Sequence, residues 1–213
     1  MLDVVDRNTS RLKSLIDDLL TLSRIESGFF RMSSAPVDVA ELVRGVAATV
    51  GPAVAEAGLV LDVDPGAAGV AVIGDGQQLE RMLLNVVTNA VKFTQAGGSL
   101  RISAREDGDT GECVLVVSDT GIGIPESDQA QLFGRFFRAT NATDRAIQGT
   151  GLGLTIVRGI AEQHGGSVEL RSREGEGTVV TVRLPRRSDS GERGTPVPVP
   201  AFASPVPASG TLH

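Results

Sequence analysis

Apolar residues recur at helical spacing near the start of the chain. The positions approximate the a/d seam of helices that pair with one another, namely Leu2, Val5, Leu12, Ile16 and Leu19. Because the opposite face is continuously charged, the pattern predicts a helix that pairs with a helix of another chain and ends near Gly28. Packing of this helix against its own domain is the alternative that the stripe leaves open.

Farther along, helical and strand-like patterns follow one another. Asp38 and Asp75 each precede a helical pattern, and aspartate is a common N-cap. Helices are predicted over 39–57, 77–93 and 152–164. Strands are predicted over 59–63, 70–73, 100–105, 114–118, 167–172 and 178–184. The segment 120–148 has little periodicity and predicts a long loop with a short helix at its middle, which in a compact domain is usually functional.

Length and composition indicate one core, since 213 residues with 41% hydrophobic content can bury one domain and an accessory element. The predicted parts are a helix over 1–28, a linker over 29–36, one domain over 37–185 and a disordered tail over 186–213. The only cysteine, Cys113, stands in an apolar run and is expected to be buried and inert.

Charge and hydropathy exclude two classes of partner. The net charge is −6, and lysines and arginines are scattered, so nucleic acid is not an expected partner. No apolar run approaches the roughly 20 residues that cross a bilayer, and Met1–Ser10 is too polar for a signal peptide. We expect a cytoplasmic protein, associated with a membrane only through a sensor part or a partner outside this chain.

The predicted helix 77–93 carries a polar constellation on one face. Asn85, Asn89 and Lys92 follow at spacings of four and three residues, which places them side by side. An amide oxygen suits a hydrated Mg²⁺ that phosphates already hold, because the site then has excess negative charge, and Asn89 fits that position. A solvated or capped helix amide is the alternative for Asn89 taken alone.

Two glycine-rich hexads follow, over 119–124 and 149–154. Asp119 ends a buried strand, where a carboxylate needs a partner, and the glycines after it let the backbone approach a ligand closely. The second hexad precedes a helix, so its backbone N–H groups can bind an anion. The spacing fits neither a Rossmann fingerprint nor a P-loop. Between the hexads, 132–138 holds three phenylalanines and two arginines, typical of a mobile lid or of a small satellite core.

Taken in this order, the polar helix face and the two hexads resemble the N box and the glycine boxes of sensor histidine kinases. The resemblance covers roughly residues 1–185, since 12–28 resembles the second dimerisation helix and 132–138 the F box of the lid. It implies the Bergerat fold shared with gyrase, Hsp90 and MutL. The expected class is α+β, a two-layer α/β sandwich with a mixed sheet and helices on one face, preceded by a lone dimerisation helix.

The resemblance also implies roles for individual residues, with ATP and Mg²⁺ as cofactors. Asn89 would bind Mg²⁺, Lys92 would meet the phosphates, and Asp119 would accept the adenine amino proton. The residues expected at the catalytic centre are Asn85, Asn89 and Lys92, and those expected around ATP are Asp119, Gly121, Gly123, Arg135, Phe136, Arg138, Gly149, Thr150, Gly151, Leu152 and Gly153.

Two departures from the family pattern shape the functional hypothesis. Asn85 stands where hydrolytic relatives carry a glutamate that activates water, so transfer is expected rather than rapid hydrolysis. The only histidines are His164 and His213, and neither lies in an acceptor motif. We therefore expect the γ-phosphoryl group to pass to a histidine on another polypeptide or a missing upstream segment.

The expected partners follow from the same departures. They are an acceptor helix, a response regulator, and a second subunit joined through helix 1–28 in a homodimer or hetero-oligomer. A non-catalytic nucleotide-binding regulatory module and an anti-sigma-type serine kinase are the alternatives.

Overall fold

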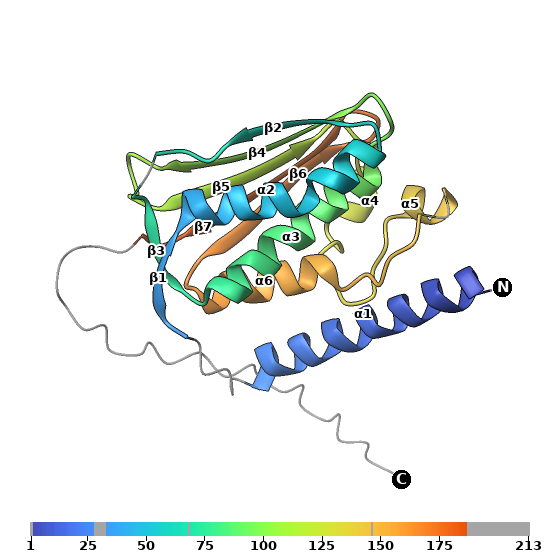
Figure 1. Cartoon of the computed structure of the whole chain (residues 1–213), viewed down its shortest axis with the longest axis horizontal. Helices are drawn as coiled ribbons and strands as arrows, with labels where there is room; N and C mark the ends of the chain where they lie inside the picture. The colour runs from blue at the N-terminus through green and yellow to red at the C-terminus, as the bar shows by residue number, and fades with distance from the viewer. Residues whose placement is uncertain (1, 28–32, 68, 146, 187–213) are drawn as a thin grey trace, which may run out of the picture.

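A five-stranded sheet forms one layer of the protein (Figure 1). The structure is a computed structural model, and it describes residues 2–27, 33–67, 69–145 and 147–186. The strands lie in the order β2-β4-β5-β7-β6. Their bounds are Val60–Asp64 for β2, Ser99–Glu106 for β4, Cys113–Asp119 for β5, Ser167–Arg173 for β6 and Gly177–Leu184 for β7. The sheet is mixed, because β2 runs parallel to β4 while the other neighbouring pairs are antiparallel.

Three helices cover one face of this sheet (Figure 1). They are α2 (Val39–Glu56), α3 (Gly76–Phe93) and α6 (Gly153–Gln163). Along β4 the buried side chains of Leu100, Ile102 and Ala104 alternate with more exposed ones. Such alternation is expected of a sheet with one covered and one solvated face. The predicted α+β two-layer sandwich, with helices on one face, is confirmed.

Aspartates begin two of these helices, as their sequence positions predict. Asp38 accepts a hydrogen bond from the backbone N–H of Glu41 at 3.0 Å. Asp75 accepts from the N–H groups of Gln77 and Gln78 at 3.0 and 3.2 Å. These carboxylates satisfy N–H groups that have no partner within the helix, so the two capped helices begin close to where the sequence places them.

A small second sheet was not predicted. β1 (Ala35–Asp38) pairs antiparallel with β3 (Ala71–Gly74), apart from the main sheet. The end of the predicted linker is therefore a strand. Four residues that include a proline carry too little alternation to indicate a strand, but an edge strand tolerates proline.

The loop between the hexads holds two short helices where one was predicted. They are α4 (Glu126–Gln129) and α5 (Thr140–Asp144). Neither spans two turns, so neither shows helical periodicity in the sequence. The predicted tail lies outside the described residues except for Arg186, which pairs with Glu106. Gly28, the predicted end of the first helix, and residues 29–32 of the predicted linker also lie outside them.

Cys113 is buried at the start of β5, as expected. Burial, with a smaller contribution from Glu106, raises the pKa of its thiol to about 11. Because the thiolate is the reactive form, this cysteine is inert at neutral pH. It belongs to the core between the sheet and the helices.

The N-terminal helix α1 (Leu2–Ser27) packs along α6 (Figure 1). Leu22 is buried within the main core, and Ile25 lies so close to α6 that a Cβ added to Gly159 would sit 2.8 Å from it. This contact matches the alternative in which the helix packs on its own domain. No helix in the described part of the chain is both long and apolar enough to cross a membrane.

The predicted seam of α1 remains open at the same time. Leu12, Ile16 and Leu19 are 59%, 50% and 55% exposed. For Leu2 and Val5 the structure describes the backbone and not the side chains. One edge of α1 therefore contacts its own domain, while the described part of the seam is left uncovered.

Candidate functional site

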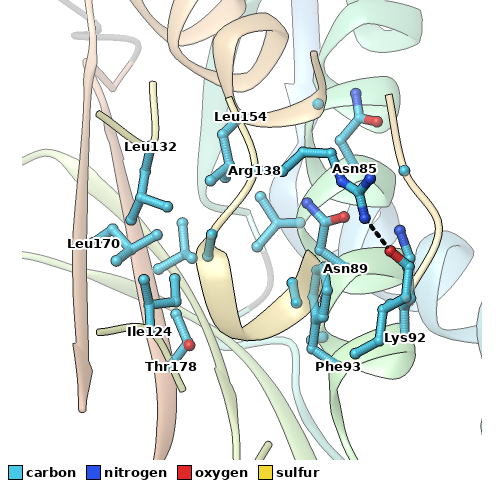
Figure 2. A pocket seen from close by; sticks show the side chains of 18 of the residues that line it. Asn85, Asn89, Lys92, Phe93, Ile124, Leu132, Arg138, Leu154, Leu170 and Thr178 are labelled. Atoms are coloured by element: carbon cyan, nitrogen blue, oxygen red, sulfur yellow. Dashed lines mark hydrogen bonds between the residues drawn. The ribbon is translucent and has the colours of Figure 1, made fainter. Parts of the chain in front are cut away.

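A cavity of about 320 Å³ lies between α3 and the sheet, bordered by α5 and by the second glycine hexad. Figure 2 shows apolar side chains such as Leu132, Ile124 and Leu170 on the side of the sheet. Asn85 and Asn89 face them from α3. The cavity therefore has an apolar wall and a polar wall, which suits a ligand with one part of each kind.

Helical periodicity places three predicted residues on the polar wall. Asn85, Asn89 and Lys92 all line the cavity from one face of α3. The Asn85 Nδ2 group is buried and has no hydrogen-bond partner among the described residues. A buried amide donor without a partner is unfavourable, so this atom is suited to donate to a bound ligand or water.

The second hexad crosses this face at close range. A Cβ added to Gly149 would lie 2.7 Å from Lys92 Nζ, and one added to Gly153 would lie 3.6 Å from Asn89 Nδ2. Gly153 also begins α6, whose first N–H groups have no partner within the helix. Glycine thus brings backbone N–H groups beside an ammonium group and two amides, an arrangement that can bind an anion.

Asp119 supplies a carboxylate to the same cavity from the end of β5. It accepts a hydrogen bond from the Gly121 N–H at 2.8 Å. Burial raises the pKa of this carboxyl, against hydrogen bonds from the backbone of Gly121 and Thr178 that lower it. A partly buried carboxylate can select a ligand that offers an N–H donor.

The first hexad needs its glycines for close backbone packing. Gly123 has a φ of +59°, and a Cβ there would lie 1.9 Å from the Arg173 carbonyl oxygen. A Cβ on Gly121 would lie 2.5 Å from the Phe93 carbonyl oxygen. These contacts press the loop after β5 against its neighbours and leave Gly123 on the cavity wall.

Polar contacts hold the loop between the hexads over the cavity. Asp128 is buried and accepts from the Thr140 N–H at 2.7 Å and from Thr140 Oγ1 at 2.9 Å, which lowers its pKa. Asn141 Nδ2 donates to the Gly123 carbonyl at 3.0 Å. Arg138 lines the cavity and donates to the Ile147 carbonyl (Figure 2). These contacts hold the described part of the loop against the cavity, where it forms a lid.

Phe136 is the unusual residue of this lid. It is the only described residue other than glycine with a positive φ, +61°, and its side chain is 62% exposed. A Cβ on Gly151 would lie 2.6 Å from the Phe136 carbonyl carbon. The backbone at Phe136 thus packs directly on the second hexad, while its ring faces away from the core.

The sequence model of one protein family, the histidine kinase-, DNA gyrase B- and HSP90-like ATPases, matches residues 74–188 of this chain. The chain belongs to this family. An uncharacterized sensor-like histidine kinase of Rhizobium meliloti is 36% identical over 183 residues, which cover 85% of this chain and 34% of that protein. The chain thus spans about a third of the length of that relative.

Solved structures of histidine kinases agree with the family assignment. Full-length ShkA in complex with AMPPNP has a TM-score of 0.74 and 31% identity, covering 86% of this chain and 38% of ShkA. The nucleotide-free catalytic domain of ThkA has a TM-score of 0.63 and 28% identity, covering 73% of this chain and 97% of that domain. The chain corresponds to the ATP-binding catalytic part of a sensor histidine kinase, and none of these matches favours the serine-kinase or regulatory alternative.

Most residues expected at the catalytic centre or around ATP in this ATPase-family domain come together at the cavity. They are Asn85, Asn89, Lys92, Asp119, Gly123, Arg138, Gly149, Thr150, Gly151 and Gly153. Gly121, Arg135, Phe136 and Leu152 do not line it. Leu152 is buried in the core, Gly121 packs on the Phe93 carbonyl, and Arg135 and Phe136 point outward from the lid.

Other lining residues were missed from sequence. Asp18 reaches the cavity from α1, Asn141 from α5 and Thr178 from β7. None of them belongs to a motif, and Asp18 is more than a hundred residues from the hexads. The charged face of α1 was the only sequence feature that pointed to Asp18, and such a face is equally typical of a solvent-exposed helix surface.

Proposed function

We propose that this domain binds Mg-ATP in the cavity and donates the γ-phosphoryl group to a histidine on another polypeptide or on a segment outside this chain. The observation that carries the proposal is the close approach of Gly149 and Gly153 to Lys92 and Asn89, with Asp119 on the same cavity. Anion-binding groups and a base-selecting carboxylate thereby share one pocket.

The adenine would bind beside Asp119. Its exocyclic amino group is a donor, and the Asp119 carboxylate accepts, which discriminates against guanine with its carbonyl at that position. The apolar wall with Ile124, Leu132 and Leu170 supports a base in this part of the cavity, because aromatic rings gain most from desolvation there.

The triphosphate would then extend toward Lys92 and the start of α6. Lys92 and Arg138 would neutralise its charge, and the N–H groups of the second hexad would bind its oxygens. Phosphoryl transfer requires chiefly positioning and charge stabilisation from a protein, and these residues supply both.

Asn89 is the proposed magnesium ligand. No group of three or more His, Cys, Asp or Glu side chains within the described ranges could hold a metal by itself. Mg²⁺ prefers oxygen ligands and retains waters, so it is commonly held by one or two protein oxygens together with substrate phosphates. The Asn89 amide oxygen fits that role, and the bound ion would supply further charge neutralisation.

The acceptor histidine would come from elsewhere. His164 is buried, its Nδ1 contacts the Ile160 carbonyl oxygen at 2.8 Å, and its Nε2 accepts from the Asp75 N–H at 3.1 Å. Both ring nitrogens are engaged far from solvent, which argues against phosphorylation there. The exposed seam of α1 gives an acceptor helix or a second subunit a surface on which to pack.

Transfer of label tests this proposal. The chain is incubated with Mg²⁺, γ-labelled ATP and a polypeptide that carries the acceptor helix of a sensor kinase, with Asn89→Ala as a matched inactive control. We expect acid-labile label on the added polypeptide with the native chain only. Label on His164, or no transfer from a chain that binds ATP, would contradict the proposal.

A further inference from the structure

The lid carries a buried polar atom that the proposed function does not use. Asn141, in α5, donates from Nδ2 to the Gly123 carbonyl oxygen at 3.0 Å. Its Oδ1 is buried and has no hydrogen-bond partner among the described residues. Asn141 also lines the nucleotide cavity.

The orientation of this amide follows from its partner. A carbonyl oxygen can only accept, so the group that faces Gly123 has to be the NH₂. Rotating the amide would bring two oxygens together and leave a buried donor unpaired. The unpartnered atom is therefore the acceptor, Oδ1, and a buried acceptor is satisfied only by a donor.

The position of Asn141 is fixed by its neighbours. Thr140 is bound through its N–H and Oγ1 to Asp128, and the adjacent Ala139 and Ala142 pack on Ile122 of the first hexad. The residues before and after Asn141 are thus held in place by these contacts. An acceptor held in this way is ordered before any ligand arrives, which reduces the entropy lost on binding.

We propose that Asn141 is a specificity-determining residue that accepts a hydrogen bond from the nucleoside half of ATP. Resting on the proposed function, this inference names the half of the ligand that the lid recognises. The phosphates of ATP offer no donor when ionised, whereas the nucleoside offers ribose hydroxyls and a second amino proton beyond the one assigned to Asp119. The contact of Asn141 with Gly123, in the hexad that Asp119 begins, places it on the side of the base and ribose.

Such a contact couples closure of the lid to the presence of a nucleoside. The same amide would join α5 to the first hexad through Gly123 and to the ligand through Oδ1. Triphosphate without a nucleoside would leave Oδ1 unpaired beneath the lid, so it would bind less well with the lid closed.

A coupling experiment separates ligand recognition from a structural role. Dissociation constants are measured by calorimetry for native chain, Asn141→Ala and Thr140→Val, each with Mg²⁺ and ATP, 2′-deoxy-ATP, 3′-deoxy-ATP or N6-methyl-ATP. Thr140→Val is the matched control, because it removes only the side-chain hydrogen bond of Thr140 to Asp128. It keeps the backbone N–H bond that holds the turn next to Asn141, and Thr140 does not line the cavity.

We expect native chain to bind ATP about fivefold more tightly than one of the three analogues, which is the range of one neutral hydrogen bond. That preference should disappear in Asn141→Ala and persist in Thr140→Val. The analogue identifies the donor as a ribose hydroxyl or the amino group.

Equal weakening of all four nucleotides by Asn141→Ala would overturn the inference, because a purely structural tie affects every nucleotide alike. Failure of native chain to bind any of them would instead overturn the proposed function.

Discussion

Asp18 on α1 accepts a hydrogen bond from Thr150 Oγ1 of the second hexad at 3.2 Å. Its other carboxylate oxygen pairs with Arg81 of α3, also at 3.2 Å, and the Asp18 side chain is only 13% exposed. One carboxylate therefore joins the N-terminal helix, α3 and the loop proposed to bind phosphates. A negative charge at that loop opposes a polyphosphate.

Replacement of Asp18 should raise the affinity for Mg-ATP. Asp18→Asn removes the charge and keeps an oxygen that can accept from Thr150, so we expect affinity about fivefold higher, corresponding to roughly 1 kcal/mol of repulsion at close range. Calorimetry measures the change. Arg81→Gln is the control, since it breaks the same ion pair and leaves the carboxylate, and it should not raise affinity. Unchanged or weaker binding by Asp18→Asn would show that the charge does not act on the ligand.

Loss of either proposed polar contact should weaken ATP binding. We expect Asn89→Ala and Asp119→Ala each to lose about 1.5–3 kcal/mol of binding free energy, the range for hydrogen bonds that involve charged groups. Glu80→Ala is the control, because Glu80 is exposed on the same helix as Asn89 and does not line the cavity. Native-like affinity in both cavity variants would remove the basis of the site assignment.

Binding should depend on pH through Asp119. Burial raises the pKa of this carboxyl, so protonation begins at a higher pH than for an exposed aspartate, and ATP affinity should fall as the pH drops through that value. For stability the sign is opposite: with the folded pKa above the unfolded one, this group favours folding at low pH, and the contribution is lost as pH rises through the folded pKa. The ATP affinity of native chain and of Asp119→Asn is measured from about pH 7 to about pH 4, which isolates the effect on binding. Parallel affinity profiles for the two proteins would contradict it.

Hydrolysis without an acceptor should be slow. The Asn85 amide lacks a basic lone pair, and Asn85→Glu would place a carboxylate on the same cavity wall. We expect that substitution to raise basal turnover about tenfold or more, within the range of general-base catalysis. Phosphate release measures it, with Asn85→Gln as the control for side-chain length. Rapid turnover by the native chain would contradict our assignment of Asn85.

The exposed seam should be required for transfer and not for ATP binding. Leu12→Asp and Ile16→Asp place charges on an apolar surface that an acceptor helix would bury, so transfer to an added acceptor polypeptide should fall at least about tenfold. Lys13→Glu, at an exposed neighbouring position, is the control. Paired transfer assays and nucleotide titrations decide the matter. Full transfer by both seam variants would mean that the acceptor docks elsewhere.

Local features were the predictable part of this molecule. The caps at Asp38 and Asp75, and the shared face of Asn85, Asn89 and Lys92, depend only on residues a few positions apart. Helical geometry fixes such relationships before any tertiary contact forms.

Features that depend on distant partners could not be predicted. β1 exists because β3 lies beside it. Asp18 reaches the second hexad only because α1 packs on α6. Within that hexad, Leu152 and Gly153 were both expected at ATP, and the direction of the first turn of α6 sends Leu152 into the core.

The left-handed backbone at Phe136 adds a local conformational cost to the position of the lid in this structure. A phenylalanine at φ +61° is about 1–2 kcal/mol above its right-handed conformation. The lid is held by the hydrogen bonds of Asp128 and Asn141 and by Thr155 Oγ1, which bonds the carbonyl oxygens of Phe133 and Gly134 at 3.1 and 3.2 Å. Together these bonds have to contribute more than that amount to hold the lid where it is. Once these bonds break, relaxation of Phe136 to a right-handed conformation lowers the free energy of the loop and favours another position of the lid.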